Sequence, residues 1–387
     1  MKEYTVDQAQ AKRWWVHAQG LDERAPFGSG VSATSVAIEH LGYVQIDTIS
    51  VIERSHHHIL FTRIPDYQKE FLRQSQSQDK TVFEYWTHAL SYLPTKDFRY
   101  FYKEMKAYEK SPSAWFRSVK KQDYQKVLKL IKKEGPISIR DINDDVLVEK
   151  NHPWASRKPS KKALQLGFYT GKLVISERLG MLKKYELAER HFSWKQKPKP
   201  ASEKEILEYI LARALRTQGI VSVDSICYLD AKKKPLIKAL LDTQVKAKKL
   251  TPLKIRGDLK TQYWIPSSLM DQKPKSDPTL VHILSPFDPL IIQRKRLQAL
   301  FDYEHRFEAY LPKEKRKFGY FALPVLIDDK IVAAVDLKTD RNQGELLIQK
   351  WSWLGKSKSV ENKRKIEQEL HRFEKFQLEI PREGTDV

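Results

Sequence analysis

A carboxylate and an amide lie two positions apart in a short apolar run, Val44-Gln45-Ile46-Asp47-Thr48. We expect this run to be a β-strand, and because strand side chains alternate between faces, Gln45 and Asp47 would point the same way. An ionised carboxylate can orient or deprotonate a water molecule and stabilise a developing positive charge, and an amide can hold either group in place. A structural role is the alternative, because Asp47 could instead cap a helix that begins near Thr48.

The charge of the chain indicates a polyanionic partner. The 387 residues carry a net charge of +21, and residues 111–275 account for 19 of these charges. The section that contains Gln45 and Asp47 is nearly neutral, so it would hold a reactive site while the middle of the chain grips the ligand. A basic surface that only keeps the protein soluble is the simpler alternative.

Length and composition limit the class of protein. At 387 residues with 41% hydrophobic residues, the chain is long enough for about two to four domains with substantial cores. It has no apolar run near the roughly 18 residues that span a bilayer, and it begins without the apolar stretch of a signal peptide. The single cysteine, Cys227, excludes an internal disulfide. We therefore expect a globular, cytoplasmic protein without membrane association.

Two segments in the middle of the chain share the pattern Gly-x-aliphatic-Ser-aliphatic-x-x-Ile, which begins at Gly135 and again at Gly219. In each segment the glycine would end an amphipathic helix and the serine would cap the next one. A further helix and a two-stranded hairpin follow, which together give the plan of a winged helix, a variant of the helix-turn-helix. The main predicted helices and hairpins cover residues 123–133, 160–170 and 172–187, and then 203–217, 235–246 and 249–266.

The ends of the chain complete the predicted architecture. The first section fits the same plan less closely, with helices expected over residues 5–19 and 32–41 before the Gln45–Asp47 strand. The last section has strand-like runs at 320–328, 331–337 and 344–353 and a closing helix at 359–376. We expect an α+β fold with three tandem winged-helix units and a C-terminal α+β domain. The predicted boundaries are 1–110, 111–198, 199–272 and 273–387.

Basic side chains gather where a winged helix would touch a duplex, at the start of the third helix and along the wing. Lysine predominates over arginine, which fits attraction to phosphates better than readout of base sequence. Any one of these side chains could also be an ordinary solvated residue. Together with two residues close to Asp47, the candidate DNA contacts are Arg54, His57, Arg157, Lys158, Lys161, Lys162, Arg178, Lys183, Lys184, Arg256 and Lys260.

The other motifs in the sequence give no support for a cofactor site, a metal site or another class of enzyme. Gly28-x-Gly30-x-x-Ala33 does not follow a strand and so lacks the geometry of a dinucleotide site. Consecutive helical residues diverge by about 100° each, so His56-His57-His58 cannot chelate one ion; we expect one of them to point inward and the others outward. The chain has no HExxH, CxxC, Walker or GxSxG motif. We expect no metal and no cofactor.

Several motifs resemble those of the YcaQ/AlkZ-type DNA glycosylases. The resemblance covers nearly the whole chain, and its most specific block is the run from Leu41 to Ile49 around Gln45 and Asp47. Further matching segments are 54–58, 63–67, 82–88, 161–164, 171–173, 285–290, 294–296 and 335–338. In that family three winged-helix units form a C-shaped basic channel that a C-terminal β-containing domain closes. The Gln-aliphatic-Asp form found here resembles the broader-range YcaQ branch more than the antibiotic-resistance AlkZ branch.

The resemblance implies a DNA glycosylase that hydrolyses the N-glycosidic bond of N7-alkylated purines, including interstrand crosslinks, during DNA repair. Gln45 and Asp47 would be its catalytic residues. No lysine stands beside their strand in the sequence, so we expect a monofunctional enzyme that leaves an abasic site, and a monomer that binds double-stranded DNA. Two alternatives stay open: a non-catalytic winged-helix regulator, and a metal nuclease that uses Asp47, Glu53 and Glu84.

Overall fold

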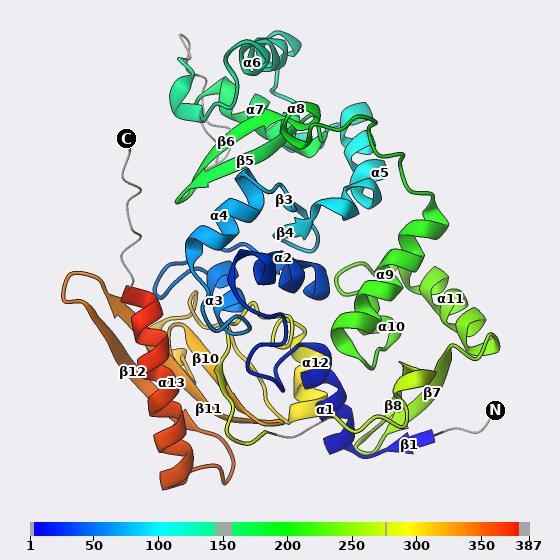
Figure 1. Ribbon diagram of the computed structural model, residues 1–387, viewed down its shortest axis with the longest axis vertical. Coiled ribbons are helices and arrows are strands. Elements are labelled where there is room, and N and C mark those ends of the chain that lie inside the picture. Colours follow the sequence, from blue (N-terminus) through cyan, green and yellow to red (C-terminus); the bar gives the residue numbers. More distant parts are fainter. Residues whose placement is uncertain (1–3, 144–146, 148–156, 275–276, 379–387) are drawn as a thin grey trace. The chain divides into compact units, whose positions relative to one another are not determined.

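The computed structural model describes residues 4–143, 147, 157–274 and 277–378 (Figure 1). The chain forms two compact bodies. The terminal body comprises residues 1–70 and 207–387, and the central body comprises residues 71–206. Helix α4 (Lys69–Ser77) runs across the boundary between them. The fold is α+β, as the sequence predicts. The winged-helix count and the domain boundaries stay predictions.

The terminal body begins with a short strand, which the sequence analysis took for helix. β1 (Tyr4–Val6) pairs in parallel with β7 (Leu250–Ile255), and α1 (Gln8–Ala18) starts only after Asp7. The Asp7 side chain accepts a hydrogen bond from the backbone N–H of Gln10 at 2.7 Å, so it is the N-cap that sets the start of the helix. α2 (Gly30–Leu41) follows, and then β2 (Val44–Gln45) and α3 (Ser55–Phe61).

The central body contains the first of the two predicted helix–helix–wing segments. β3 (Val82–Trp86) and β4 (Leu90–Pro94) form an antiparallel pair before α5 (Phe98–Lys110). α6 (Lys121–Glu134) and α7 (Pro159–Tyr169) pack together ahead of the hairpin of β5 (Leu173–Leu179) and β6 (Leu182–Leu187). A short helix, α8 (Ala188–Phe192), closes the segment. The helices and hairpin predicted for this segment are confirmed to within two residues.

The second such segment has the same plan and lies in the terminal body apart from the first four residues of α9 (Glu203–Gln218). α9, α10 (Val223–Ile226) and α11 (Lys234–Lys246) precede the hairpin of β7 and β8 (Asp258–Pro266). In both segments the aliphatic residue of the repeated pattern forms an antiparallel bridge to the wing, Ile137 to Tyr185 and Val221 to Trp264. The pattern serine then caps a short helical turn in both, as predicted, because its side chain accepts a backbone N–H in a capping box.

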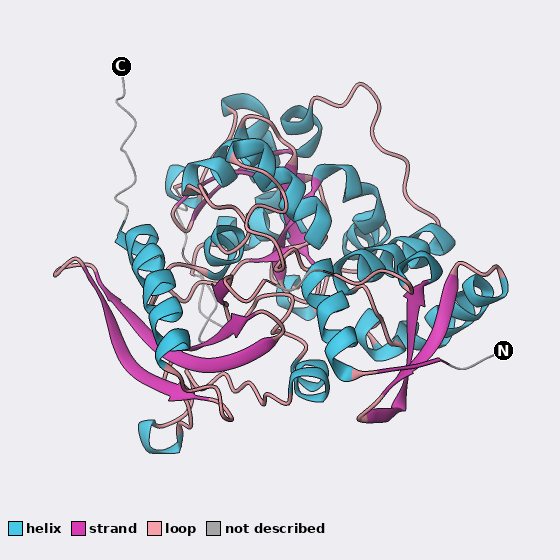
Figure 2. Ribbon diagram, turned by 60° about the horizontal axis from the view of Figure 1, so that its bottom comes forward, coloured by secondary structure: helices cyan, strands magenta, loops and turns pink. Residues whose placement is uncertain are grey.

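The C-terminal part of the terminal body is a four-stranded antiparallel sheet in the order β12-β11-β10-β9. Its strands are β9 (Val281–Ile283), β10 (Ala322–Ile327), β11 (Lys330–Asp340) and β12 (Glu345–Trp353), with α12 (Arg294–Phe301) between the first two. α13 (Val360–Leu378) contacts β9 and β12, and Figure 2 shows this last helix beside the long curved strands. β10, β11, β12 and the closing helix match the prediction, whereas β9 and α12 were not predicted.

One hydrophobic core joins the two ends of the chain within the terminal body. Trp15 of α1, Leu253 of β7, Leu297 of α12 and Leu326 of β10 belong to a single cluster of buried residues. Burial of such side chains is the main stabilising contribution to a fold of this kind. The N-terminal helices are therefore fixed to the C-terminal sheet. No described helix is long and apolar enough to cross a bilayer.

Candidate active site

Gln45 and Asp47 lie on a strand that is shorter than expected. β2 ends at Gln45, and Asp47 lies two residues beyond it in an extended segment. Gln45 is buried and Asp47 is half-buried, and the intervening Ile46 is buried as well. The strand is therefore shorter than predicted, and the common direction of Gln45 and Asp47 stays a prediction, because burial on both faces does not test it. The half-exposed Asp47 carboxylate still lies two residues after the buried Gln45 amide.

Asp47 closes a turn and does not cap a helix. Its Oδ1 accepts a hydrogen bond from the backbone N–H of Ile49 at 2.8 Å, which is an Asx-type turn. The next helix, α3, begins only at Ser55. The helix-cap alternative is therefore wrong. Because one carboxylate oxygen is fixed by the backbone, the orientation of the other oxygen is restricted too.

The approach to β2 is fixed from one side by α9. Gly42 ends α2 in a left-handed conformation (φ +73°) and donates its N–H to the carbonyl of Ile38 at 2.9 Å. Arg213 of α9 covers this turn so closely that a Cβ on Gly42 would lie 2.4 Å from the Arg213 Cγ. The Arg213 guanidinium also lies 5.7 Å from the centre of the Tyr43 ring. Glycine is therefore required at the residue where the chain turns into the strand.

The segment that follows Asp47 is fixed by the C-terminal sheet and helix. The backbone N–H of Thr339 donates to the carbonyl of Val51 at 2.9 Å, and Arg341 donates to the carbonyl of Ser50 at 3.1 Å. The Oε1 of Gln377, from α13, accepts the backbone N–H of Glu53 at 2.5 Å. Sequence reasoning did not find Thr339, Arg341 and Gln377. They lie about 290 residues or more from the segment that they hold.

A second carboxylate near the site is already engaged. Glu53 pairs with Lys69 at 2.5 Å and accepts the backbone N–H of Arg54 at 2.9 Å. Burial opposes ionisation of Glu53, but His57, Lys69 and the Arg54 N–H outweigh it and lower the pKa of Glu53. The half-buried His57 shares a hydrogen bond with the Tyr67 hydroxyl at 2.7 Å. Arg54 and His57 therefore belong to one polar cluster beside the segment that carries Asp47.

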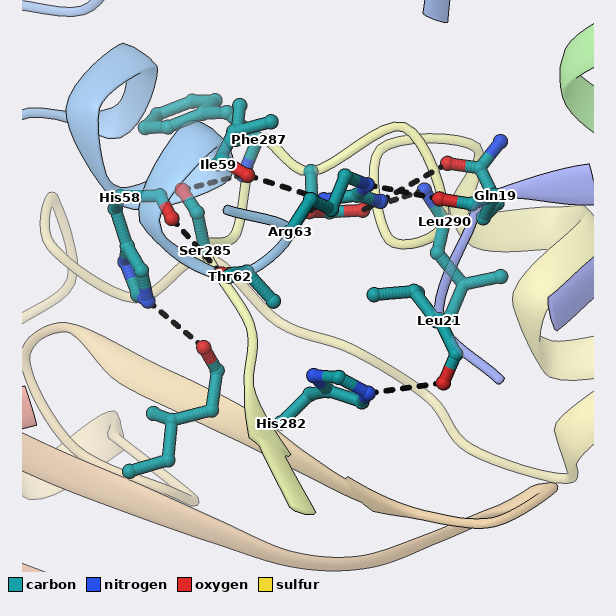
Figure 3. Close-up of polar contacts among 12 residues, drawn as sticks. Gln19, Leu21, His58, Ile59, Thr62, Arg63, His282, Ser285, Phe287 and Leu290 are labelled. Atoms are coloured by element: carbon teal, nitrogen blue, oxygen red, sulfur yellow. Dashed lines mark hydrogen bonds and ion pairs between the residues drawn. The ribbon is translucent and has the colours of Figure 1, made fainter. Parts of the chain in front are cut away.

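The three consecutive histidines differ from expectation. His56 and His58 are both buried and only His57 is partly exposed, because α3 is packed on two sides. The Nε2 of His58 donates to the backbone carbonyl of Ile283 at 2.8 Å, and the His58 ring is labelled in Figure 3. Burial lowers the pKa of His58 to about 4, so this ring is neutral at pH 7. His58 is a packing residue of the core.

A buried ion pair connects α3 to the segment 285–290, one of the motifs that carry the family resemblance. The side chains of Arg63 and Asp288 are both 0% exposed, and two hydrogen bonds of 2.7 and 3.0 Å join them. Arg63 also donates to the backbone carbonyl of Gln19 at 2.8 Å (Figure 3). These two motif residues therefore have a structural role, which is to fix the chain just after α3 to the segment 285–290.

Two of the basic residues expected to bind DNA are buried. Arg178 lies in β5 with its side chain turned inward, where it forms two hydrogen bonds of 2.5 and 2.6 Å to Glu84. Lys162 is buried in α7, donates to Ser118 at 3.0 Å and lies 5.2 Å from the Trp115 ring centre. Because neither side chain is available to a phosphate in this structure, we leave Arg178 and Lys162 out of the proposed DNA-contacting residues.

The remaining basic candidates divide by exposure. Three are half-buried: Lys184 pairs with Glu177 at 3.1 Å, Lys158 donates to a backbone carbonyl at 3.3 Å, and Lys183 lies 5.6 Å from the Phe168 ring centre. Burial lowers the pKa of Lys183 to about 8. The exposed candidates are Arg157 and Lys161 in the central body, and Arg256 and Lys260 in the terminal body.

The acidic residues of the metal-nuclease alternative are not free to bind an ion together. Glu84 is held by Arg178 and by Gln76, whose amide donates to it at 3.0 Å, and Glu53 is held by Lys69. Among the described residues, no three His, Cys, Asp or Glu side chains lie close enough together to coordinate a metal. This geometry gives the nuclease alternative no support.

Comparison with known proteins now identifies the family. The sequence model for AlkZ-like DNA glycosylases matches residues 38–376, which is most of the chain and includes the Gln45–Asp47 segment. The chain belongs to the AlkZ-like DNA glycosylase family. This AlkZ-like protein is therefore a DNA glycosylase, and its substrate is DNA.

A solved structure supports the fold of this AlkZ-like glycosylase. The DNA glycosylase AlkZ of Streptomyces sahachiroi superimposes with a TM-score of 0.61, over 96% of this chain and 97% of that one. The two sequences are 14% identical, so this similarity concerns the fold alone. The α+β architecture of this AlkZ-like chain is shared over nearly its full length.

Proposed function

We propose that this glycosylase hydrolyses the N-glycosidic bond of N7-alkylated purines in double-stranded DNA, including purines that are part of an interstrand crosslink. Asp47 and Gln45 are the proposed catalytic residues. The observation that carries this proposal is the half-buried Asp47 carboxylate, held in a turn by the Ile49 N–H directly after a buried strand.

The chemistry of the lesion fits this site. Alkylation at N7 makes the purine cationic, so the base leaves more readily, and the sugar develops oxocarbenium character as the bond breaks. A fixed carboxylate stabilises that positive charge and orients or deprotonates the attacking water. Because its Oδ1 is already held by the backbone, Asp47 needs little reorganisation to do so. The buried Gln45 would position the water or the carboxylate.

We further propose that the enzyme is monofunctional. A glycosylase that also cleaves the DNA backbone needs an uncharged amine to attack the sugar. Lys69 belongs to the polar cluster next to the site, but its ammonium is engaged by the Glu53 carboxylate at 2.5 Å and is not free to attack. Water is then the nucleophile and an abasic site is the product. Borohydride trapping should give no covalent protein–DNA adduct, and a trapped adduct would overturn this point.

Exposed cations would bind the DNA backbone. Arg157 and Lys161 lie at the start of α7, and Arg256 and Lys260 lie on the β7–β8 hairpin. These are positions at which winged helices touch phosphates. We propose that the enzyme acts as a monomer, because tandem units in one chain remove the need for a symmetric partner.

The deciding experiment uses a duplex with one N7-methylguanine, incubated with the protein in EDTA and then treated with alkali to cleave abasic sites. We expect strand breaks at the lesion and none in the undamaged duplex. Breaks that disappear in EDTA would indicate a metal-dependent nuclease. Stable DNA binding without breaks at this lesion would refute the proposed substrate. A second duplex with an N7-linked interstrand crosslink tests unhooking in the same way.

A further inference from the structure

The turn after α10 (green in Figure 1) presents an exposed leucine in a strained conformation. Leu229 has φ +58° and its side chain is 74% exposed. Among the described residues, six residues other than glycine have positive φ, and the other five are Lys80, Ser193, Lys248, Asp302 and Asp328. A left-handed conformation is unfavourable for a side chain such as leucine. Packing does not explain it, because the side chain is largely in solvent.

The turn is held firmly at its base although its tip is exposed. Cys227 is buried, and its carbonyl accepts the backbone N–H of Asp230 at 2.9 Å. The hydroxyl of Tyr228 donates to the carbonyl of Ile292 at 3.1 Å. The Asp230 carboxylate pairs with Lys233. The neighbours of Leu229 therefore fix its side chain in an outward direction.

The same turn packs against the helix that covers the approach to β2. Cys227, at the base of the turn, shares a buried cluster with Leu211 of α9. Arg213 of α9 lies 5.7 Å from the centre of the Tyr43 ring, and Tyr43 directly precedes β2, which carries Gln45. The helix that packs against this turn therefore also covers the residue that leads into the proposed catalytic strand. In the flanking run Lys232-Lys233-Lys234, Lys233 pairs with Asp230 and Lys234 pairs with Asp224 at 2.5 Å, so the exposed Lys232 is the cation that suits the phosphates of a backbone.

We propose that Leu229 is a wedge that inserts between bases of the DNA beside the damaged nucleotide. Proteins that distort a duplex insert apolar side chains, leucine among them, between base steps and partly unstack them. An apolar tip on a rigid turn, beside an exposed lysine and packed against the helix that covers the approach to β2, has the chemistry required. This role rests on the proposed function, since it places Leu229 at the lesion that Asp47 acts on.

Variants of Leu229 distinguish a wedge that inserts into DNA from a residue that only stabilises the turn. Asparagine tolerates left-handed backbone, so Leu229→Asn keeps the turn while removing the apolar tip. We expect its unfolding temperature to equal or exceed that of the wild type. Single-turnover excision of N7-methylguanine should fall at least tenfold, whereas Leu229→Met, which keeps apolar reach, should stay within about threefold. Val360→Asn, which removes another exposed apolar side chain at the start of α13, is the matched control and should leave excision unchanged.

A 2-aminopurine placed next to the lesion reports unstacking directly. Its fluorescence should rise when the wild type or Asp47→Asn binds and should not rise with Leu229→Asn. A Leu229→Asn variant with wild-type fluorescence and rate would overturn the wedge, as would a wild type that produces no rise. If the wild type unstacks the base in a Leu229-dependent way but does not excise it, the wedge stands and the proposed substrate fails.

Discussion

Replacing Asp288 by asparagine should destabilise the terminal body strongly, without creating a cavity. Asn has the same shape but no charge, so the Arg63 guanidinium would stay fully buried with only neutral acceptors around it, among them the carbonyls of Gln19 and Ile59. Breaking a buried pair in this way costs about 3–5 kcal/mol. That is a large part of the roughly 5–15 kcal/mol that stabilises a folded protein.

Thermal and urea unfolding measure this loss. At about 2–4 °C per kcal/mol for a body of this size, Asp288→Asn should lower the unfolding temperature by roughly 6–20 °C. The double variant Arg63→Met with Asp288→Leu should recover much of the loss, because it leaves no unpaired charge in the core. A loss below about 1 kcal/mol in Asp288→Asn, or a double variant as unstable as the single one, would refute the reasoning.

Three further outcomes follow from the structure. The Gly42→Ala variant should lose about 1–2 kcal/mol of its free energy of unfolding, because alanine is unfavourable in left-handed backbone. It should also excise more slowly, because the turn leads into β2. Urea unfolding measures the first effect and single-turnover rates measure the second. Lys161→Ala should lower the slope of log Kd against log salt by about one, because an exposed phosphate contact is lost. Arg178→Met should destabilise the protein and leave that slope unchanged, because Arg178 is paired with Glu84. Equal slopes in the two variants would contradict the different roles of Lys161 and Arg178. Burial lowers the pKa of His58 and of His282 from 6.5 to about 4, so the unfolded chain binds the extra protons on acidification. The free energy of unfolding should therefore fall as pH drops from 6.5 toward 4, by about 1.4 kcal/mol per pH unit for each ring. Replacing both by Gln should reduce this slope, and the slope that stays comes from other buried rings such as His191, whose pKa burial also lowers to about 4.

Local patterns predicted much of the fold. The repeated Gly-x-aliphatic-Ser pattern located helices and hairpins in two segments to within a few residues, because helix ends and capping serines are specified by nearby residues. The helix predicted over residues 5–19 instead begins at Gln8, because β1 pairs with β7 about 250 residues away. Such pairing leaves no local signal.

It was harder to predict which individual charged side chains are buried. Arg178 was grouped with exposed cations because it lies in a basic wing, yet its partner Glu84 is 94 residues away and draws it into the core. Glu84 lies between Phe83 and Tyr85 in an apolar strand, and that placement is the signal of a buried carboxylate that needs a cation. The anchors of the active-site segment, Thr339 and Gln377, come from distant elements and give no such signal.

The most direct test of the proposed chemistry is the split between rate and affinity in Asp47→Asn. The variant keeps the shape of the side chain and its turn with Ile49, but removes the charge that would stabilise the sugar cation. Single-turnover excision of N7-methylguanine should fall by at least about a hundredfold while the Kd for the same duplex stays within about twofold of the wild type. Excision at the wild-type rate, or equal losses of rate and affinity, would contradict a catalytic role for Asp47.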